Sequence, residues 1–160
     1  MLSVQLLCVG KMKEKFYIEG ASEYVKRLGG YCRLTVTELP EERLPDNPSA
    51  AQIESALERE GNAILSKLPK GGKVVALCVE GKTMSSEKLA ETVDAWAVQG
   101  ASQISFLIGG SYGMHESVKQ RADLRLSMSP MTFPHHLARV MVLEQIYRAF
   151  KINEGSSYHK

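Results

Sequence analysis

Two runs of residues decide the fold: ISFLIGGSYGMH at 104–115 and LSMSPMTFPHHLARVMVLEQIYRAF at 126–150. The first run predicts a buried strand that ends in a glycine turn, because its apolar residues are continuous and glycine permits a sharp change of direction. The second predicts a short strand, a proline-containing loop and a long, largely apolar helix. We expect Pro134 in the first turn of this helix and Thr132 as its cap.

The upstream sequence alternates between strand-like and helix-like segments. Short apolar or Thr- and Val-rich runs predict strands at residues 3–9, 32–39, 73–80 and 103–108. Apolar residues at helical spacing predict helices at residues 14–28, after Ser49, and after Ser85 or Ser86. The run at 73–80 is almost continuously apolar, which predicts a strand buried on both faces. This alternation predicts a single α/β domain over residues 1–160, with a mainly parallel sheet and helices on both faces.

Composition and charge narrow the class of protein. No apolar run reaches the roughly 18–20 residues that span a membrane, and no signal peptide is visible, so we expect a cytoplasmic protein without membrane contact. Cys8, Cys32 and Cys78 lack metal-ligand spacing, which favours buried thiols in a reducing compartment and no metal site. Residues 104–160 hold seven Lys and Arg against four Asp and Glu. This excess permits a nucleic-acid partner without demanding one.

Ligands of parallel sheets bind beyond the carboxyl ends of the strands. Three expected loops leave such ends, at residues 81–84, 109–113 and 127–133. Gly109 lets backbone approach a ligand, and the loop at 127–133 is small, apolar and able to wrap an adenine and a thioether. Leu77 offers an apolar floor. Together these features favour a pocket for an adenosine-type ligand that carries no phosphates.

A serine hydrolase is the second hypothesis. GGSYG at 109–113 fits the motif G-x-S-x-G directly after a strand, where a nucleophile elbow would place Ser111. A later acid, Asp123, and later histidines complete the order found in α/β-hydrolases. Against this hypothesis, the chain is short for such a sheet, and Asp123 lies close to Ser111 in sequence.

The long C-terminal helix carries apolar residues around most of its circumference. Such a helix packs on its own core and on a second surface, so we predict a homodimer through it; a central helix of a monomer is the alternative. Glu144 and Arg148 share one face, either as an intrahelical pair or to position a polar substrate. The last residues, SYHK, suit stacking and phosphate contact with RNA, although tails are usually disordered.

The segments LIGGSYGMH, LSMSPMTFPHHLARVMVLEQIYRAF and SYHK resemble the SPOUT-class methyltransferases that modify N3 of a pseudouridine in large-subunit ribosomal RNA. The resemblance covers essentially the whole chain, from LLCVGKMKEKF through VVALCVEGK to the end. It implies a trefoil knot within about residues 104–155, which the rarity of knots would not predict. It also implies S-adenosylmethionine as methyl donor, no metal, a homodimer with the site at its interface, and 23S rRNA within the assembled ribosome as substrate.

The resemblance also assigns residues. The implied cofactor site comprises Leu77, Gly109, Met128, Ser129, Pro130, Met131, Thr132 and Phe133, and it makes Ser111 a turn residue. We predict substrate contacts by Arg139, Tyr158 and Lys160. The pseudouridine N3–H must lose its proton during methyl transfer, which makes His159 a candidate base and Glu144 its competitor. Arg148 is predicted to stabilise negative charge on the neighbouring carbonyl oxygens. A ribosome-binding factor without catalysis is a further alternative.

Overall fold

The computed structural model describes all 160 residues and contains one five-stranded, fully parallel sheet with the order β2-β1-β4-β3-β5. The strands are β1 (Ser3–Val9), β2 (Arg33–Leu39), β3 (Lys73–Lys82), β4 (Gln103–Ile108) and β5 (Leu124–Leu126). The helices are α1 (Lys15–Leu28), α2 (Ala50–Ser66), α3 (Ser86–Val98), α4 (Glu116–Arg121) and α5 (His135–Asn153). The predicted α/β class with a parallel sheet is confirmed.

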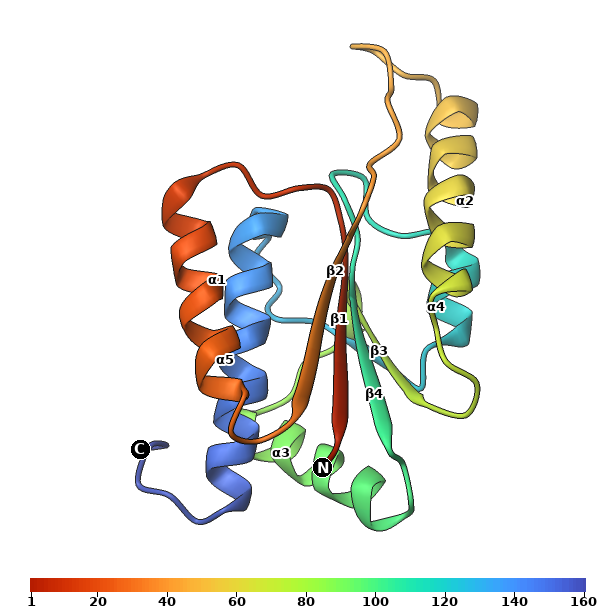
Figure 1. Ribbon diagram of the computed structural model, residues 1–160. Helices are drawn as coiled ribbons and strands as arrows, with labels where there is room; N and C mark the ends of the chain where they lie inside the picture. The colour runs from red at the N-terminus through yellow and green to blue at the C-terminus, as the bar shows by residue number, and fades with distance from the viewer.

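Helices cover both faces of the sheet, as predicted. Helices α1, α3 and α5 lie on one face, and α2 and α4 lie on the other (Figure 1). Strand β1 shows why helices are needed on both faces. Successive side chains of a strand point to opposite faces, and β1 carries apolar side chains on both. Leu6 and Cys8 join the cluster beneath α1, α3 and α5, whereas Leu7 and Val9 join the cluster beneath α2 and α4. The sheet is therefore buried on both sides.

The helix starts agree with the sequence in two cases and differ in one. Ser49 forms a capping box with Gln52 at the start of α2, and Ser85 caps α3 by accepting a hydrogen bond from Lys88 N at 3.1 Å. At α5 the predicted positions are wrong, because Pro134 is itself the N-cap and Thr132 makes no cap. Pro134 has an extended ψ of 137°, so the helix begins one residue later than expected.

Strand β3 differs from its prediction in length and burial. It runs to Lys82, but it pairs with β4 only as far as Leu77, and beyond Leu77 its pairing with β5 is irregular and resumes only at Lys82. Its far half is therefore exposed, as Val79 at 63% shows, and only the first half is buried on both faces. A Cβ on Gly81 would lie 2.8 Å from the β5 backbone, so this glycine permits close strand contact and belongs to no phosphate-binding loop.

Helix α5 packs between α1 and α3 and turns Val142, Leu143 and Ile146 toward the sheet. The segment at 127–134 carries the chain from β5, at the edge of the sheet, to this central helix (Figure 1). Strand pairing alone does not establish how the chain is threaded, so the trefoil knot stays a prediction. None of the helices combines the length and the apolar character that a membrane span requires.

Candidate functional site at the carboxyl ends of the strands

A cavity of about 760 Å³ lies at the carboxyl ends of β3, β4 and β5. This volume lies in the range of small-molecule sites. Most of the residues predicted to hold the cofactor line it: Leu77, Gly109, Met128, Ser129, Met131, Thr132 and Phe133. Pro130 is in the same loop but does not line the cavity. The expected loop at 81–84 is also absent from the wall, because β3 continues to Lys82 and presents residues 77–80 instead.

The glycine turn after β4 forms one wall of the cavity. A Cβ on Gly109 would lie 2.4 Å from the carbonyl oxygen of Gly113, and Gly110 forms an isolated bridge with Gly113. We had expected a ligand to approach Gly109 closely. Instead, the backbone of the turn itself lies against this residue. Within this turn, Ser111 N–H donates a hydrogen bond to Glu41 Oε1 at 3.1 Å.

The structure does not assemble a hydrolase triad around Ser111. A nucleophile elbow holds its serine in a strained turn, yet no residue other than glycine has a positive φ. Asp123 Oδ2 accepts a hydrogen bond from Val74 N at 2.8 Å, which fixes it at the amino end of β3. Ser111 follows the carboxyl end of β4, so about one strand length, roughly 20 Å, separates the two residues.

The loop after β5 is shaped by its own hydrogen bonds. Ser127 Oγ donates to the Ser129 carbonyl at 3.1 Å, and Ser129 Oγ accepts from Met131 N at 3.0 Å. Small and apolar side chains of this loop line the cavity, and Met131 among them is 74% exposed. The loop therefore offers an uncharged surface, as an adenine ring or a thioether requires.

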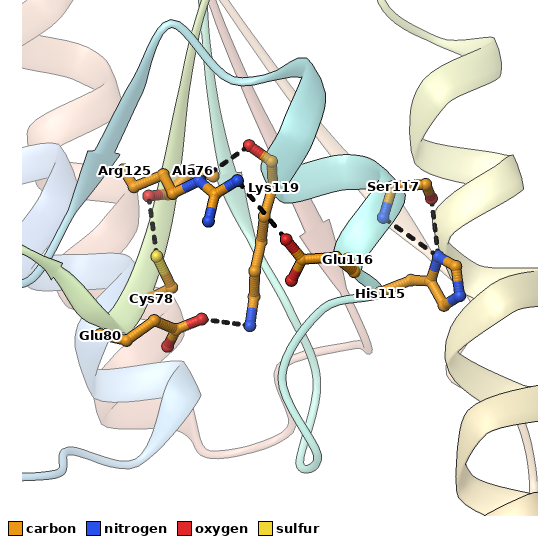
Figure 2. A network of polar contacts seen from close by, with 8 residues as sticks. All are labelled: Ala76, Cys78, Glu80, His115, Glu116, Ser117, Lys119 and Arg125. Atoms are coloured by element: carbon orange, nitrogen blue, oxygen red, sulfur yellow. Dashed lines mark hydrogen bonds and ion pairs between the residues drawn. The ribbon is translucent and has the colours of Figure 1, made fainter.

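The part of the wall formed by β3 and α4 carries the only formal charges of the lining. Glu80 of β3 forms an ion pair with Lys119 of α4, and Arg125 donates to the Lys119 carbonyl at 3.1 Å (Figure 2). The hydrogen bond from Lys119 lowers the pKa of Glu80, which keeps this carboxylate ionised. Burial raises the pKa of the neighbouring Cys78 thiol, so the thiol stays protonated. No cluster of His, Cys, Asp and Glu in the chain has the composition of a metal site.

A second cluster of side chains joins α5 to the C-terminal residues. It includes the three residues predicted to be catalytic, Glu144, Arg148 and His159. Arg148 Nε donates to Glu144 Oε1 at 2.8 Å, and Tyr158 OH donates to Glu144 Oε2 at 2.7 Å. The hydrogen bond to Glu144 raises the pKa of Tyr158 to about 12, so the phenol remains protonated. His159 Nδ1 lies 3.0 Å from Arg148 Nη1, and His159 Nε2 lies 2.6 Å from Glu87 Oε1. We call these residues (Glu87, Glu144, Arg148, Tyr158 and His159) the tail cluster.

The tail cluster and the cavity occupy different parts of α5. None of the five tail-cluster residues lines the cavity, which α5 reaches only through His135 and Ala138. At a rise of about 1.5 Å per residue, Arg148 lies roughly 15 Å along the helix from Ala138. Lys160, the last predicted substrate contact, is exposed. The structure brings the predicted catalytic residues together, but it does not bring them to the cavity of the same chain.

Arg139 is placed differently from the other predicted substrate contacts. Its side chain is 1% exposed, and its guanidinium pairs with Glu38 and donates to the Gly10 carbonyl at 3.0 Å. These contacts tie α5 to the ends of β1 and β2. A direct contact with substrate would require Arg139 to leave both partners. In this fold Arg139 therefore has a structural role.

Two charged side chains that line the cavity, Glu80 and Lys119, were not predicted, and His135 was considered only as one of the histidines of the hydrolase hypothesis. His135 had one available signal, since it directly follows the loop of the predicted cofactor site and opens α5. Glu80 and Lys119 had none, because their approach depends on how α4 packs beside the far half of β3.

Comparison with known proteins identifies the class. The sequence model described as Predicted SPOUT methyltransferase matches residues 2–159. The chain therefore belongs to the SPOUT methyltransferase family, as the resemblance indicated. Among its relatives are proteins named ribosomal RNA large subunit methyltransferase H. Those of Clostridioides difficile (strain 630) and Listeria monocytogenes serotype 4a (strain HCC23) are 46% and 43% identical to it, over 99% of this chain and 100% of each relative.

Solved structures support the fold. A probable methylase family protein from Haemophilus influenzae Rd KW20 superposes with a TM-score of 0.54, covering 98% of this chain and 70% of that one. A putative methyltransferase from Legionella pneumophila, in complex with bound cofactor SAM, superposes with a TM-score of 0.52, covering 92% and 66%. Both are 13% identical to this chain, so they show a shared fold alone.

Proposed function

We propose that this chain transfers a methyl group from S-adenosylmethionine to N3 of a pseudouridine in 23S rRNA, acting in the cytoplasm on the assembled ribosome. The observation that carries the proposal is the cavity at the carboxyl ends of β3, β4 and β5, lined by the loop at 127–133. Full-length similarity to relatives named for large-subunit ribosomal RNA methylation supports the choice of substrate.

The lining of the cavity suits S-adenosylmethionine. The loop after β5 offers apolar and small polar groups to an adenine, and the single ion pair of Glu80 and Lys119 leaves the remaining wall uncharged. When bound, S-adenosylmethionine supplies an activated methyl group, so the residues around it need to bind, orient and manage a proton. Leu77, Gly109 and the loop at 128–133 are the residues that we propose for its binding.

We further propose a homodimer in which α5 of one subunit packs antiparallel to α5 of the other. Leu137, Val140, Met141 and Tyr147 of this helix remain partly exposed in the single chain. The cavity lies at the amino end of α5 and the tail cluster lies in its carboxyl half, so an antiparallel pair brings the cluster of one subunit toward the cavity of the other. In this arrangement Glu144, Arg148 and His159 act on the nucleotide, and Tyr158 and Lys160 contact the RNA.

Methyl transfer is tested with radiolabelled S-adenosylmethionine and ribosomes from a strain that lacks the endogenous enzyme, with free RNA and separated subunits in parallel. Label in 23S rRNA of assembled ribosomes alone is the expected result. Label in free RNA but not in ribosomes would reject the assembled substrate. Particle binding without transfer would make the protein a non-catalytic ribosome-binding factor.

The shared site is tested by mixing two inactive variants. Gly109→Val places a side chain against the backbone of Gly113 and so deforms the cavity wall, and Arg148→Ala removes the guanidinium of the tail cluster. After random exchange in a twofold dimer, half of the molecules are mixed and each has one intact site, so about a quarter of wild-type activity should return. No recovery, in a mixture that mass measurement shows to have exchanged subunits, would place both groups in one subunit.

A further inference from the structure

The proposed reaction releases a proton from N3, and a group beside the methyl donor must accept it. The cavity lining contains two charged side chains, Glu80 and Lys119, and these are paired with each other. The lining contains one imidazole, that of His135 at the first position of α5. Imidazole is the side chain whose ordinary pKa lies closest to neutral pH, where a general base is most effective.

His135 differs from the other histidines in its hydrogen bonding. The other three are occupied: His115 by Ser117 and Glu54, His136 by Glu14, and His159 by Arg148 and Glu87. His135 contacts the ring of His136, with 4.3 Å between ring centroids, but it makes no hydrogen bond to another residue. A nitrogen of its ring is therefore free to bind a ligand in the cavity.

His135 lies close to Gly10, the residue that follows β1. Gly10 has a φ of +97°, and a Cβ there would lie 3.9 Å from both His135 Nε2 and His136 Nε2 and 3.3 Å from Glu41 Oε2. Imidazole and carboxylate thus converge above the end of β1. Glu41 comes from the loop after β2 and also accepts the hydrogen bond of Ser111 N–H, at the cavity wall. This carboxylate therefore lies near His135 on a different element and is hydrogen-bonded to the glycine turn.

Burial, together with the neighbouring His136 and Arg139, favours the neutral form of the His135 ring. Burial lowers the pKa of His135, and the adjacent His136 and Arg139 of α5 lower it further. Glu41, and Glu14 at the start of α1, oppose this effect, but the pKa remains below its ordinary value. A neutral imidazole has a lone pair available for a proton.

We propose that His135 is a catalytic residue of this chain whose imidazole accepts the N3 proton of the pseudouridine during methyl transfer. This inference rests on the function proposed above. As N3 forms its bond to the methyl carbon, the bond from that carbon to sulfur breaks and its electron pair stays on sulfur, which leaves a neutral thioether. The N3 proton passes to His135, and the resulting imidazolium returns it to water after the product leaves.

The tail cluster is less suited to this step. In the described conformation both ring nitrogens of His159 are engaged, and both carboxylate oxygens of Glu144 accept hydrogen bonds. Either residue would have to lose a partner before it accepts a proton. In our proposal the tail cluster binds and orients the nucleotide, and His135 takes the proton.

The decisive comparison is His135→Asn against His136→Asn, a neighbouring ring that does not line the cavity. The first change should lower kcat about 10²–10⁴-fold, the usual contribution of a general base, and remove the acid limb of the pH–rate profile. S-adenosylmethionine affinity, measured by calorimetry, should stay unchanged in both variants. His136→Asn should keep its acid limb. A His135→Asn enzyme with a normal kcat and acid limb, or a His159→Ala enzyme that lacks the limb, would overturn the proposal.

Glu41→Gln provides a second readout that does not depend on turnover. Glutamine keeps an acceptor for Ser111 N–H but removes the charge that raises the pKa of His135. The imidazole C–H signal of His135 should titrate at lower pH in this variant, and the acid limb should move in the same direction. If the imidazole titration of His135 moves but the acid limb of the pH–rate profile does not, another group accepts the proton. If the wild type methylates no ribosomal RNA, the proposed function fails; if it does and His135→Asn is fully active, this inference alone fails.

Discussion

Replacing Arg139, which does not itself line the cavity, by leucine should destabilise the protein. Arg139 is 1% exposed and donates to Glu38 and to the Gly10 carbonyl, so it joins α5 to the ends of two strands. A buried carbonyl that loses its donor costs about 1–3 kcal/mol. Glu38 keeps its hydrogen bond from Met12 N and is 37% exposed, so solvent screening limits its share to about 1 kcal/mol or less.

One term opposes this loss. Arg139 Nε is buried and has no hydrogen-bond partner. Leucine removes this unsatisfied donor, which offsets part of the loss in unfolding free energy. The net destabilisation should be about 1–3 kcal/mol. For a chain of this size, this corresponds to a decrease in Tm of about 2–12 °C.

The effect should also depend on pH. Burial alone would raise the pKa of Glu38, but the hydrogen bond from Met12 N and the Arg139 guanidinium outweigh burial and lower it. A carboxylate with a lowered folded-state pKa stabilises the protein above its unfolded pKa, about 4.3, and loses this contribution as pH falls through the folded value. The difference between wild type and Arg139→Leu should therefore be largest near pH 7 and shrink at acid pH.

Urea unfolding at fixed protein concentration, repeated between pH 7 and the acid limit of reversible unfolding, measures this difference. Lys88→Leu is the matched control, because Lys88 pairs with Glu91 at 3.2 Å on the surface, and such pairs contribute about 0–1 kcal/mol. An Arg139→Leu variant as stable as wild type at pH 7, or a loss that does not change with pH, would refute this account of the ion pair.

Three further changes test the core and the site. Gly81→Ala should weaken S-adenosylmethionine binding at least about tenfold in calorimetry, because its Cβ would meet the backbone of Leu126 at 2.8 Å and displace the loop that follows. Gly30→Ala is the control: a Cβ at Gly30 has no atom within 4 Å, so this variant should bind normally. Leu143→Ala, at a fully buried position, should lose about 2–5 kcal/mol of unfolding free energy in urea, and a loss below about 1 kcal/mol would contradict this packing. Ser111→Ala should retain methyl transfer to ribosomes, and fluorophosphonate labelling of Ser111 in the wild type would reopen the hydrolase hypothesis.

Local pattern predicted most of the fold. The apolar runs at 3–9 and 103–108 each end at a polar or glycine boundary, so their strands were evident, and Ser49 marked the start of α2. The far half of β3 was misjudged because its burial depends on a neighbour, and β4 stops pairing with it at Leu77. Periodicity reports which residues form a strand, but it does not report how far the adjacent strand extends.

The site was predictable where it follows from chain order and not where it follows from packing. The loop at 127–133 lies after a strand and before a helix, so its place at the carboxyl ends of the strands was expected, and spacing along α5 joined Glu144 to Arg148. The contact of Glu87 with His159 spans 72 residues, which no local spacing predicts. His135 and His136 share one sequence context, and only their positions in the fold distinguish a free ring from a bonded one.

The position of β1 has a consequence for how the protein is made. β1 pairs with β2, in which Arg33 aligns with Ser3, but its other edge pairs with β4, in which Gln103 aligns with Ser3. During synthesis the first strand therefore exposes one row of unpaired amides and carbonyls until about two thirds of the chain has emerged. Such an edge is a template for pairing with other chains, and sheets with distant partners form slowly. A nascent chain that stops before residue 103 should accordingly need a chaperone, and its aggregation should end once β4 is complete.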